Sequence, residues 1–237
     1  MSDPAPSPTA SPKTPASAAA NIVIPYYSSY GTTHRLAKAV EAGAEEVPGT
    51  TVRRRRIPEL DGAAEAMSGQ DAYDAAQDAM ADVPRVEHDD LRWADGIIWG
   101  TPTRFGNMAA QVKQFIDTLG GMWYTGELEG KATGVFVSTG SIHGGHETTI
   151  LTSLVPLIHL GMVFVGVRYS TNDQIMTTEG VGGSPYGPST MPREDREQNA
   201  PMAGERETAR SLGTRVSRVA ARLHAPAERA ASDAPMV

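Results

Sequence analysis

Residues 21–40 read NIVIPYYSSYGTTHRLAKAV, and they predict a strand, a tight loop and a helix in that order. The run 21–27 is apolar, β-branched and aromatic, which is typical of a buried strand. Residues 28–33 form a short loop of hydroxyl side chains around a glycine, and apolar residues then recur at helical spacing over 36–44. A strand that passes directly into a helix is the repeating unit of parallel α/β sheets.

Two more strand, loop and helix units follow in residues 95–119 and 132–161. The run 95–100 (DGIIWG) is apolar without alternation, as expected for a parallel strand covered on both faces. Its loop, 101–107, leads into a helix that we expect to begin near Met108. The loop of the second unit, 138–145, is also rich in hydroxyl groups and glycine.

The remaining segments complete an open sheet. We expect a strand on the outer side of the sheet at 51–57, a polar insertion with helical pieces at 58–90, a fifth strand at 162–167, a long loop at 168–204 and a closing helix at 205–223. Five strands that alternate with helices indicate right-handed crossovers. The predicted fold is therefore α/β, an open three-layer sandwich with a five-stranded parallel sheet and helices on both faces.

The four consecutive arginines at positions 53–56 lie on the predicted outer strand. Because alternate strand residues point to opposite faces, at most two of them share one side. We interpret them as a solvated strand with carboxylate partners rather than as a nucleic-acid contact.

Length and composition predict one domain and exclude several kinds of chemistry. The 237 residues suit a domain at 21–223, between a disordered Pro/Ala/Ser-rich tail at 1–20 and a flexible C-terminal tail at 224–237. The net charge of −7 predicts no nucleic-acid partner. Because cysteine is absent, disulfides, iron–sulfur clusters and thiol nucleophiles are excluded, and redox chemistry needs a bound cofactor.

The long uncharged stretch 148–167 has the length of a membrane span, but it contains proline, histidine, glycine and several hydroxyl residues. We interpret it as a helix followed by a buried strand. We therefore expect no integral membrane segment and a cytoplasmic protein.

The three loops after the predicted strands indicate a ligand site, because ligands of open α/β sheets bind at the carboxyl ends of the strands. In SSYGTTH (28–34), hydroxyls and the free N–H groups of a helix N-terminus can surround a phosphate. An ordinary helix cap with a turn glycine is the alternative for any single loop. Three such loops together favour ligand binding.

The sequence does not match the residue pattern of other common site motifs. GELEGK (126–131) lacks the hydroxyl of a P-loop, no G-x-G-x-x-G follows the first strand, and no G-x-S-x-G occurs. The histidines of HGGHE (143–147) do not have a zinc-site spacing, so we expect no metal and interpret HGGHE as a loop that reaches solvent or a cofactor.

Several longer strings resemble one known family. They are YYSSYGTT (26–33), GTPTRFGNM (100–108), GGMWYTGELEGK (120–131), VSTG (137–140), TTILTSLVPLIHLGM (148–162) and GGSPYG (182–187). Over residues 21–223 the chain resembles the flavodoxin-like NAD(P)H:quinone oxidoreductases of the tryptophan-repressor-binding-protein type.

The resemblance implies a noncovalent FMN with NADH or NADPH as co-substrate. It implies cofactor contacts from three loops and one helix, namely Ser28, Ser29, Tyr30, Gly31, Thr32, Thr33, Thr103, Arg104, Phe105, Ser138, Thr139, Gly140, Ser141, Ile142, His143 and His159. Tyr30 and Trp123 are implied on the substrate side, and His159 is implied to reach the flavin from another part of an assembly. The turn 141–145 is slightly longer here than is usual in the family, so the contacts of Ile142 and His143 depend on its path.

Some of these residues also have a structural interpretation. Arg104 could form a surface salt bridge, Trp123 and Tyr124 could be core or interface aromatics, and His159 could be a core histidine. In the functional interpretation, the flat rings of Trp123 and Tyr124 suit stacking with a quinone or a nicotinamide. A cation at Arg104 suits the pyrimidine edge of a reduced flavin.

The expected function is two-electron reduction of a quinone by NAD(P)H through FMN, with ping-pong kinetics in a homo-tetramer built as a dimer of dimers. The alternatives are a one-electron carrier of the flavodoxin type and a regulatory protein that binds a transcription factor. The insertions 58–90 and 168–204 argue against a minimal flavodoxin. The sequence contains no DNA-reading helix or basic patch that would support the regulatory alternative.

Overall fold

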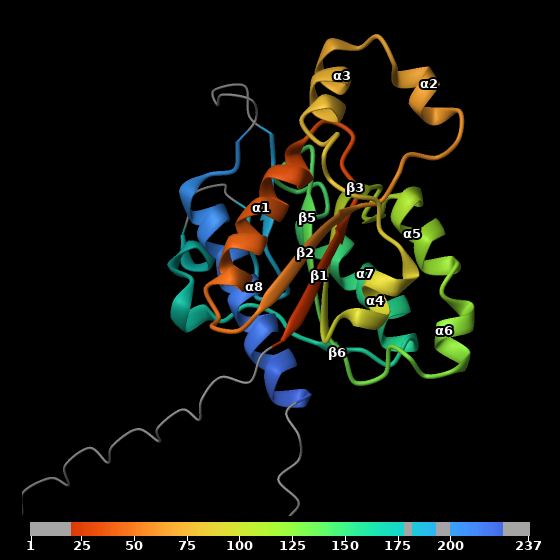
Figure 1. Ribbon diagram of the computed structural model, residues 1–237. Helices are drawn as coiled ribbons and strands as arrows, with labels where there is room; N and C mark the ends of the chain where they lie inside the picture. The colour runs from red at the N-terminus through yellow and green to blue at the C-terminus, as the bar shows by residue number, and fades with distance from the viewer. Residues whose placement is uncertain (1–19, 178–181, 193–199, 225–237) are drawn as a thin grey trace, which may run out of the picture.

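The computed structural model describes residues 20–177, 182–192 and 200–224, and in these residues a parallel sheet lies between two layers of helices (Figure 1). The strand order is β2-β1-β3-β5-β6. The bounds are β1 Asn21–Tyr26, β2 Thr51–Arg56, β3 Gly96–Arg104, β5 Ala132–Ser138 and β6 Val163–Phe164. This is the doubly wound order of flavodoxin-like sheets, so the predicted fold class is confirmed.

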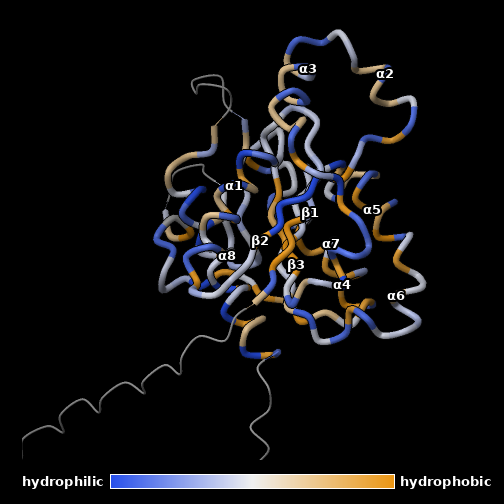
Figure 2. The backbone as a smooth tube through the Cα atoms, in the orientation of Figure 1, coloured by the Kyte–Doolittle hydropathy of each residue, from blue (hydrophilic) through white to orange (hydrophobic). Residues whose placement is uncertain are grey.

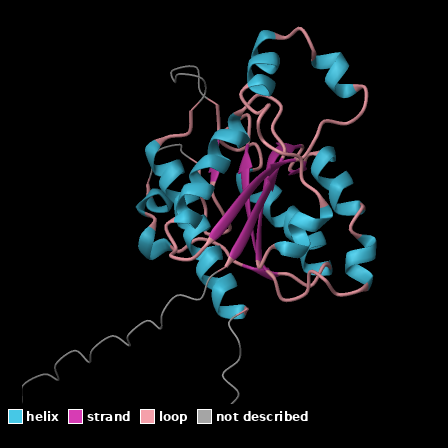
Figure 3. Cartoon of the chain, viewed as in Figure 1, coloured by secondary structure: helices cyan, strands magenta, loops and turns pink. Residues whose placement is uncertain are grey.

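Helices cover both faces of the sheet, which explains the unbroken apolar runs of its central strands (Figure 3). One face packs against α1 (Thr32–Glu45) and α8 (Ala203–Leu223). The other packs against α4 (His88–Trp93), α5 (Ala110–Asp117) and α7 (His146–His159). The central strands β1 and β3 are among the most hydrophobic parts of the trace (Figure 2). Two apolar clusters therefore form the core, one on each side of the sheet.

Helices α1 and α8 cross at backbone distance because each has a glycine at the contact. A Cβ on Gly43 would lie 2.0 Å from the carbonyl oxygen of Arg210, and a Cβ on Gly213 would lie 2.0 Å from that of Val40. The Thr214 hydroxyl donates to the Gly43 carbonyl at 2.8 Å across the same crossing. Any side chain at either glycine would push the two helices apart.

Three of the four arginines of β2 have the carboxylate partners that the sequence predicted, and the fourth, Arg56, donates to the Val83 carbonyl at 3.1 Å. Arg53 and Arg55 share one side of the strand and both contact Asp90, at 3.2 and 2.9 Å. Arg54 faces the other way and contacts Glu41 at 2.8 Å. The alternation of strand side chains thus divides the positive charge between two layers.

The insertion at 58–90 contains helical pieces, as predicted, namely α2 (Ala63–Met67), α3 (Asp71–Asp78) and the start of α4. Helices α2 and α3 extend beyond the carboxyl ends of the strands (Figure 1). The insertion is therefore placed next to the loops that follow β1 and β3.

The segment after Gly100 differs from the prediction of a loop followed directly by a helix. Strand β3 continues to Arg104 and pairs antiparallel with β4 (Asn107–Met108). Phe105 and Gly106 have φ values of 53° and 77°, so they turn the chain in two residues as in a tight hairpin. Met108 consequently lies in this hairpin, and helix α5 begins only at Ala110.

The fifth strand is also shorter than the predicted 162–167. After β6 the Val165 N–H still donates to the Thr133 carbonyl, but the Val167 N–H donates to Pro185, so the chain has left β5. Strand β7 (Ser189–Thr190) then pairs with the end of β5. The predicted loop 168–204 therefore supplies the second half of the sheet edge and two 3₁₀ helices, η1 (Tyr169–Thr171) and η2 (Asp173–Met176).

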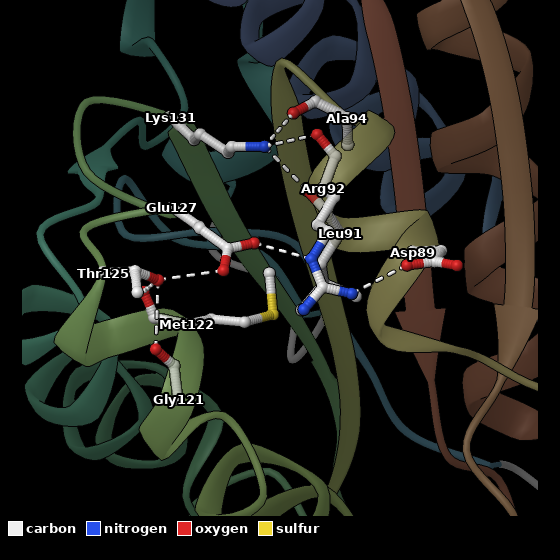
Figure 4. A network of polar contacts seen from close by, with 9 residues as sticks. All are labelled: Asp89, Leu91, Arg92, Ala94, Gly121, Met122, Thr125, Glu127 and Lys131. Atoms are coloured by element: carbon white, nitrogen blue, oxygen red, sulfur yellow. Dashed lines mark hydrogen bonds and ion pairs between the residues drawn. The ribbon is translucent and has the colours of Figure 1, made fainter.

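A buried lysine joins β5 to the end of α4 (Figure 4). The Lys131 Nζ donates to the carbonyls of Leu91, Arg92 and Ala94 at 2.7, 2.9 and 2.6 Å. Arg92 in turn contacts Glu127 at 2.6 Å, close to the end of α6 (Gly120–Tyr124). The GELEGK string that fails as a P-loop is thus a structural connection at the base of the sheet.

Most of both predicted tails, residues 1–19 and 225–237, lies outside the described residues. Ala20, which we predicted as the last tail residue, is buried, and its carbonyl accepts the Thr51 N–H. The uncharged stretch 148–167 forms most of α7 and then β6. Among the described helices, none combines the length and the apolar character that crossing a membrane would require.

Candidate functional site

A pocket of about 360 Å³ lies at the carboxyl ends of the parallel strands, where the three predicted loops meet. Its lining comes from all three loops and from both insertions: Ser28, Ser29, Tyr30, Thr32, Thr33, Ala72, Pro102, Thr103, Arg104, Ser138, Thr139, Gly140 and Pro192. Hydroxyl groups predominate, and among the described residues Arg104 is the one charged side chain of the lining and no carboxylate belongs to it. This donor set suits a phosphate-bearing ligand.

The first loop turns sharply into α1 through Gly31, whose φ of 82° is in the left-handed region. The cap residue Gly31 has no side chain, and the Ser28 hydroxyl accepts the His34 N–H at 3.4 Å, so the N–H groups of Thr32 and Thr33 are the ones available to a ligand. The Ser28 and Ser29 hydroxyls are buried next to them. The positive end of the helix dipole and these neutral donors could together hold a phosphate without a metal or a lysine.

A chain of hydrogen bonds fixes the Ser29 hydroxyl. The Tyr27 hydroxyl lies 2.9 Å from it, and the Arg104 Nη2 donates to it at 3.2 Å. Tyr27 also donates to Glu59, and burial together with this carboxylate raises the pKa of the Tyr27 phenol. The first and second loops are therefore connected through one serine, and the insertion supports both.

The hairpin after β3 positions the second loop. The Thr103 Oγ1 accepts from the Gly106 N–H at 3.2 Å and from the Thr149 hydroxyl at 2.6 Å, which attaches the hairpin to α7. Arg104 makes its side-chain hydrogen bonds to the Thr103 carbonyl and to Ser29, and no carboxylate pairs with it within the described ranges. Its guanidinium is thus oriented at the pocket and is not neutralised by an acid.

The third loop is held by His146, which the sequence analysis assigned to a loop that reaches solvent or a cofactor. That assignment is wrong, because His146 is buried in the first turn of α7. The Thr139 hydroxyl donates to the Ser141 carbonyl, so it can only accept from His146 Nε2, 2.9 Å away. His146 Nδ1 then accepts from the Ser189 hydroxyl at 2.7 Å.

This pattern places a proton on Nε2 and suits a neutral imidazole. Burial lowers the pKa of His146, which favours the same neutral form. Ser189 also accepts the Gly183 N–H at 2.8 Å, so the GGSPYG segment and the third loop are joined through one histidine. The sequence offers one signal for this supporting role of His146: it is a polar residue at the start of an apolar helix.

Several predicted residues do not line the pocket. Gly31 forms the turn below it, Phe105 is fully exposed at the hairpin tip, and Ser141, Ile142 and His143 continue away on the surface. His159 is exposed at the far end of α7, and Trp123 is 57% exposed on α6. Neither His159 nor Trp123 is therefore a core residue, and both lie outside the pocket of their own chain.

The insertion 58–90 contributes contacts that the sequence did not predict. The Gln77 amide donates to the Ser29 carbonyl at 3.0 Å, and the Tyr30 hydroxyl donates to Gln70 at 3.0 Å. Ala72 of α3 lines the pocket itself. These contacts come from polar residues without a motif, so no local pattern in the sequence identifies them.

The described residues contain no group of three or more His, Cys, Asp or Glu side chains placed to hold a metal ion.

Comparison with known proteins gives consistent matches. Residues 26–175 match the family described as NADPH-dependent FMN reductase. The chain is 45% identical over 204 residues to an NAD(P)H dehydrogenase (quinone) of Geobacter sulfurreducens, covering 86% of this chain and 99% of that protein. It is 46% identical over 213 residues to an NAD(P)H dehydrogenase (quinone) of Paracoccus denitrificans, covering 90% and 99%.

Among solved structures, a flavodoxin, WrbA-like protein from Agrobacterium tumefaciens matches with a TM-score of 0.57 and 25% identity, covering 86% of this chain and 99% of that one. A flavodoxin from the domain Archaea matches with a TM-score of 0.53 and 16% identity, covering 84% and 98%, which supports the fold alone.

Proposed function

The chain belongs to the NADPH-dependent FMN reductase family, and from this premise we propose that it reduces quinones with NAD(P)H by hydride transfer through a bound FMN. It is an NAD(P)H:quinone oxidoreductase by its likeness to relatives of that name over almost their whole length. The finer proposal concerns the residues that hold the cofactor, the order of the two half-reactions and the assembly.

The observation that supports this proposal most strongly is the pocket where the three loops meet. Its donors are hydroxyls, one arginine and the N-terminus of α1, and this set suits the phosphate and the polar ring edge of FMN. When bound, FMN supplies the redox chemistry by accepting a hydride from NAD(P)H and passing it to a quinone. The residues of the pocket bind the cofactor and orient it.

We assign the phosphate to the first loop, where Ser28, Ser29, Thr32 and Thr33 surround the helix N-terminus that Gly31 opens. The ring lies, in this proposal, between the second and third loops. Thr103, Arg104 and Phe105 would be on one side and Ser138, Thr139, Gly140, Ser141, Ile142 and His143 on the other. Arg104 would then offer a cation to the pyrimidine edge of the ring, where negative charge develops on reduction.

The proposed order of substrates rests on the sequence, which offers no second nucleotide-binding unit. The chain has no dinucleotide fingerprint that would give the nicotinamide nucleotide a binding half of its own. NAD(P)H and the quinone would therefore use the same exposed face in turn, beside Tyr30. The resulting kinetics are ping-pong.

The kinetic experiment measures NADH oxidation at several fixed benzoquinone concentrations, with the protein saturated with FMN. Parallel double-reciprocal lines are expected. Intersecting lines would establish a ternary complex and exclude the shared face. A yellow protein that never turns over a quinone would instead be a one-electron carrier.

The assembly proposed is a homo-tetramer, a dimer of dimers. Helix α7 has an apolar stripe on its exposed side, formed by Leu151, Val155 and Ile158, which are 42%, 56% and 61% exposed. Their spacing of four and three residues places them on one face. His159 follows this stripe directly. In such an assembly, His159 and Trp123 of one subunit could reach the flavin of a neighbouring subunit, although both lie outside the pocket of their own chain.

A further inference from the structure

The outer surface of α8 contains a second cavity, of about 380 Å³, which shares no lining residue with the pocket at the strand ends. It lies between α8, the C-terminal end of α1 and the segment at residues 168–171. Its lining includes five arginines: Arg168, Arg210, Arg215, Arg218 and Arg222. We call this cavity the basic groove.

The charge of the basic groove is opposite to that of the chain. Its lining contains five arginines against two glutamates, Glu46 and Glu207, whereas the whole chain has 28 acidic and 21 basic residues. Both glutamates contact the same arginine, Arg210. In the part of the chain that the structure describes, Arg168, Arg218 and Arg222 have no carboxylate partner.

The groove also holds its cations close to one another. The Arg215 Nη1 donates to the Gly166 carbonyl at 2.7 Å, which fixes this partly buried guanidinium beside the loop that carries Arg168. Burial, and then the charge of Arg168, lower the pKa of Arg215. Like charges placed together raise the energy of the empty groove, and an anion between them would lower it.

The donors are arranged on one face of a long helix. Arg215, Arg218 and Arg222 are three and four residues apart on the 21-residue helix α8, so they project from the same side. One turn earlier, the Ser211 hydroxyl accepts from the Asn172 amide at 3.1 Å, which leaves its own proton free to donate. Guanidinium forks on a rigid helix match the geometry of phosphate oxygens.

We propose that the basic groove binds a small molecule that carries two or more phosphate groups. Its volume is in the range of small-ligand sites. No aromatic residue of the described chain lines it, so the ligand is recognised through its phosphates and not by stacking on a base. The lack of stacking residues in this lining and the acidic net charge disfavour single-stranded nucleic acid as the occupant.

Isothermal titration calorimetry with tripolyphosphate tests this, on the full chain in excess FMN so that the phosphate loop is occupied. The double variant Arg218→Ala/Arg222→Ala should bind tripolyphosphate about tenfold more weakly or worse than the wild type. The matched control, Arg206→Ala/Lys113→Ala, removes two cations that do not line the groove, and it should leave the affinity within about twofold.

Two further measurements distinguish phosphate recognition by guanidinium forks from simple attraction between opposite charges. Arg218→Lys/Arg222→Lys keeps the charge but loses the forks, and it should recover only part of the affinity. Inorganic phosphate should bind more weakly than tripolyphosphate. The proposal is overturned if tripolyphosphate does not bind at physiological ionic strength, if the control weakens binding equally, or if only an RNA oligonucleotide binds. Quinone turnover, measured separately, should be unchanged in all variants.

Discussion

The Thr33 hydroxyl lies 2.9 Å from the Ser138 hydroxyl, although the two residues are 105 positions apart in the chain. Thr33 is in the first turn of α1, and Ser138 is the last residue of β5. Both are buried and line the pocket, so their hydrogen bond joins the first and third loops in its wall. The site depends on this closure, because neither loop encloses a ligand by itself.

Replacing Gly31 with valine should weaken FMN binding by about tenfold or more. The φ of 82° at this position is in the region that β-branched residues avoid, so the turn would change its path and displace the helix N-terminus. Fluorescence titration of FMN measures the effect. Gly62→Val is the matched control, because Gly62 also has a positive φ (79°) and begins a helix but lies outside the pocket. Equal affinity of both variants would remove the first loop from the cofactor site.

Replacing His146 with alanine should destabilise the third loop. The change leaves the Thr139 and Ser189 hydroxyls without their common partner, which costs about 1–3 kcal/mol of folding free energy. Flavin affinity should fall severalfold, and His146→Gln, whose amide can donate to Thr139, should recover part of it. Glu147→Ala, an exposed change next to His146 that lies outside the pocket, is the control. An unchanged flavin affinity for His146→Ala would show that the loop does not need this support.

Acid should destabilise the fold partly through His34. Burial, together with the charges of Lys38, Arg54 and Arg35, lowers the pKa of His34 from 6.5 to about 3. A depressed pKa means that the neutral form contributes its full stability above pH 6.5 and that this contribution is lost as the pH falls toward 3.

The free energy of unfolding should therefore fall by about 1.4 kcal/mol more per pH unit below pH 6.5 in the wild type than in His34→Asn, whose amide oxygen can still accept from Tyr26. Urea unfolding at several pH values measures the difference in slope. Identical slopes would mean that the pKa of His34 is the same in the folded and unfolded protein.

Replacing Lys131 with methionine should cost about 3 kcal/mol of stability, because three carbonyls at the end of α4 lose a charged donor. Lys113→Met is the control, since Lys113 is exposed and pairs only with Asp117 one turn away, an interaction worth about 0.5 kcal/mol or less. Denaturant unfolding of the two variants should differ clearly. A similar small loss in both would indicate that water replaces the amine.

Replacing Val155 with glutamate should break the proposed tetramer without unfolding the chain. Val155 is 56% exposed in the centre of the α7 stripe, so a charge there costs little in one subunit but would be buried between two. Light scattering should show smaller species with an unchanged melting temperature and lower turnover. Lys113→Glu, a charge reversal on exposed α5, should leave the assembly intact. A tetramer that survives Val155→Glu would place the interface elsewhere.

The sequence by itself determined the fold class and most of the pocket. The strand, loop and helix unit of NIVIPYYSSYGTTHRLAKAV occurs twice more in the chain. Parallel strands bring the loops that follow them to one edge of the sheet, so Ser28, Thr103 and Thr139 converge as predicted. These features follow from local periodicity and from turn residues, which short stretches of sequence encode.

Only the tertiary structure decided which distant residues support those loops. His146 belongs to a glycine-rich HGGHE string that is typical of a loop, yet packing of α7 buries it between Thr139 and Ser189. Strand β7, which follows the GGSPYG segment, takes over the sheet edge after β6 ends, and no local signal places Ser189 beside Val137. The arginines of α8 are dispersed along a helix and form one groove only where residues 168–171 fold against them. Contacts of this kind depend on how whole elements pack, and the chain does not encode them in any short window.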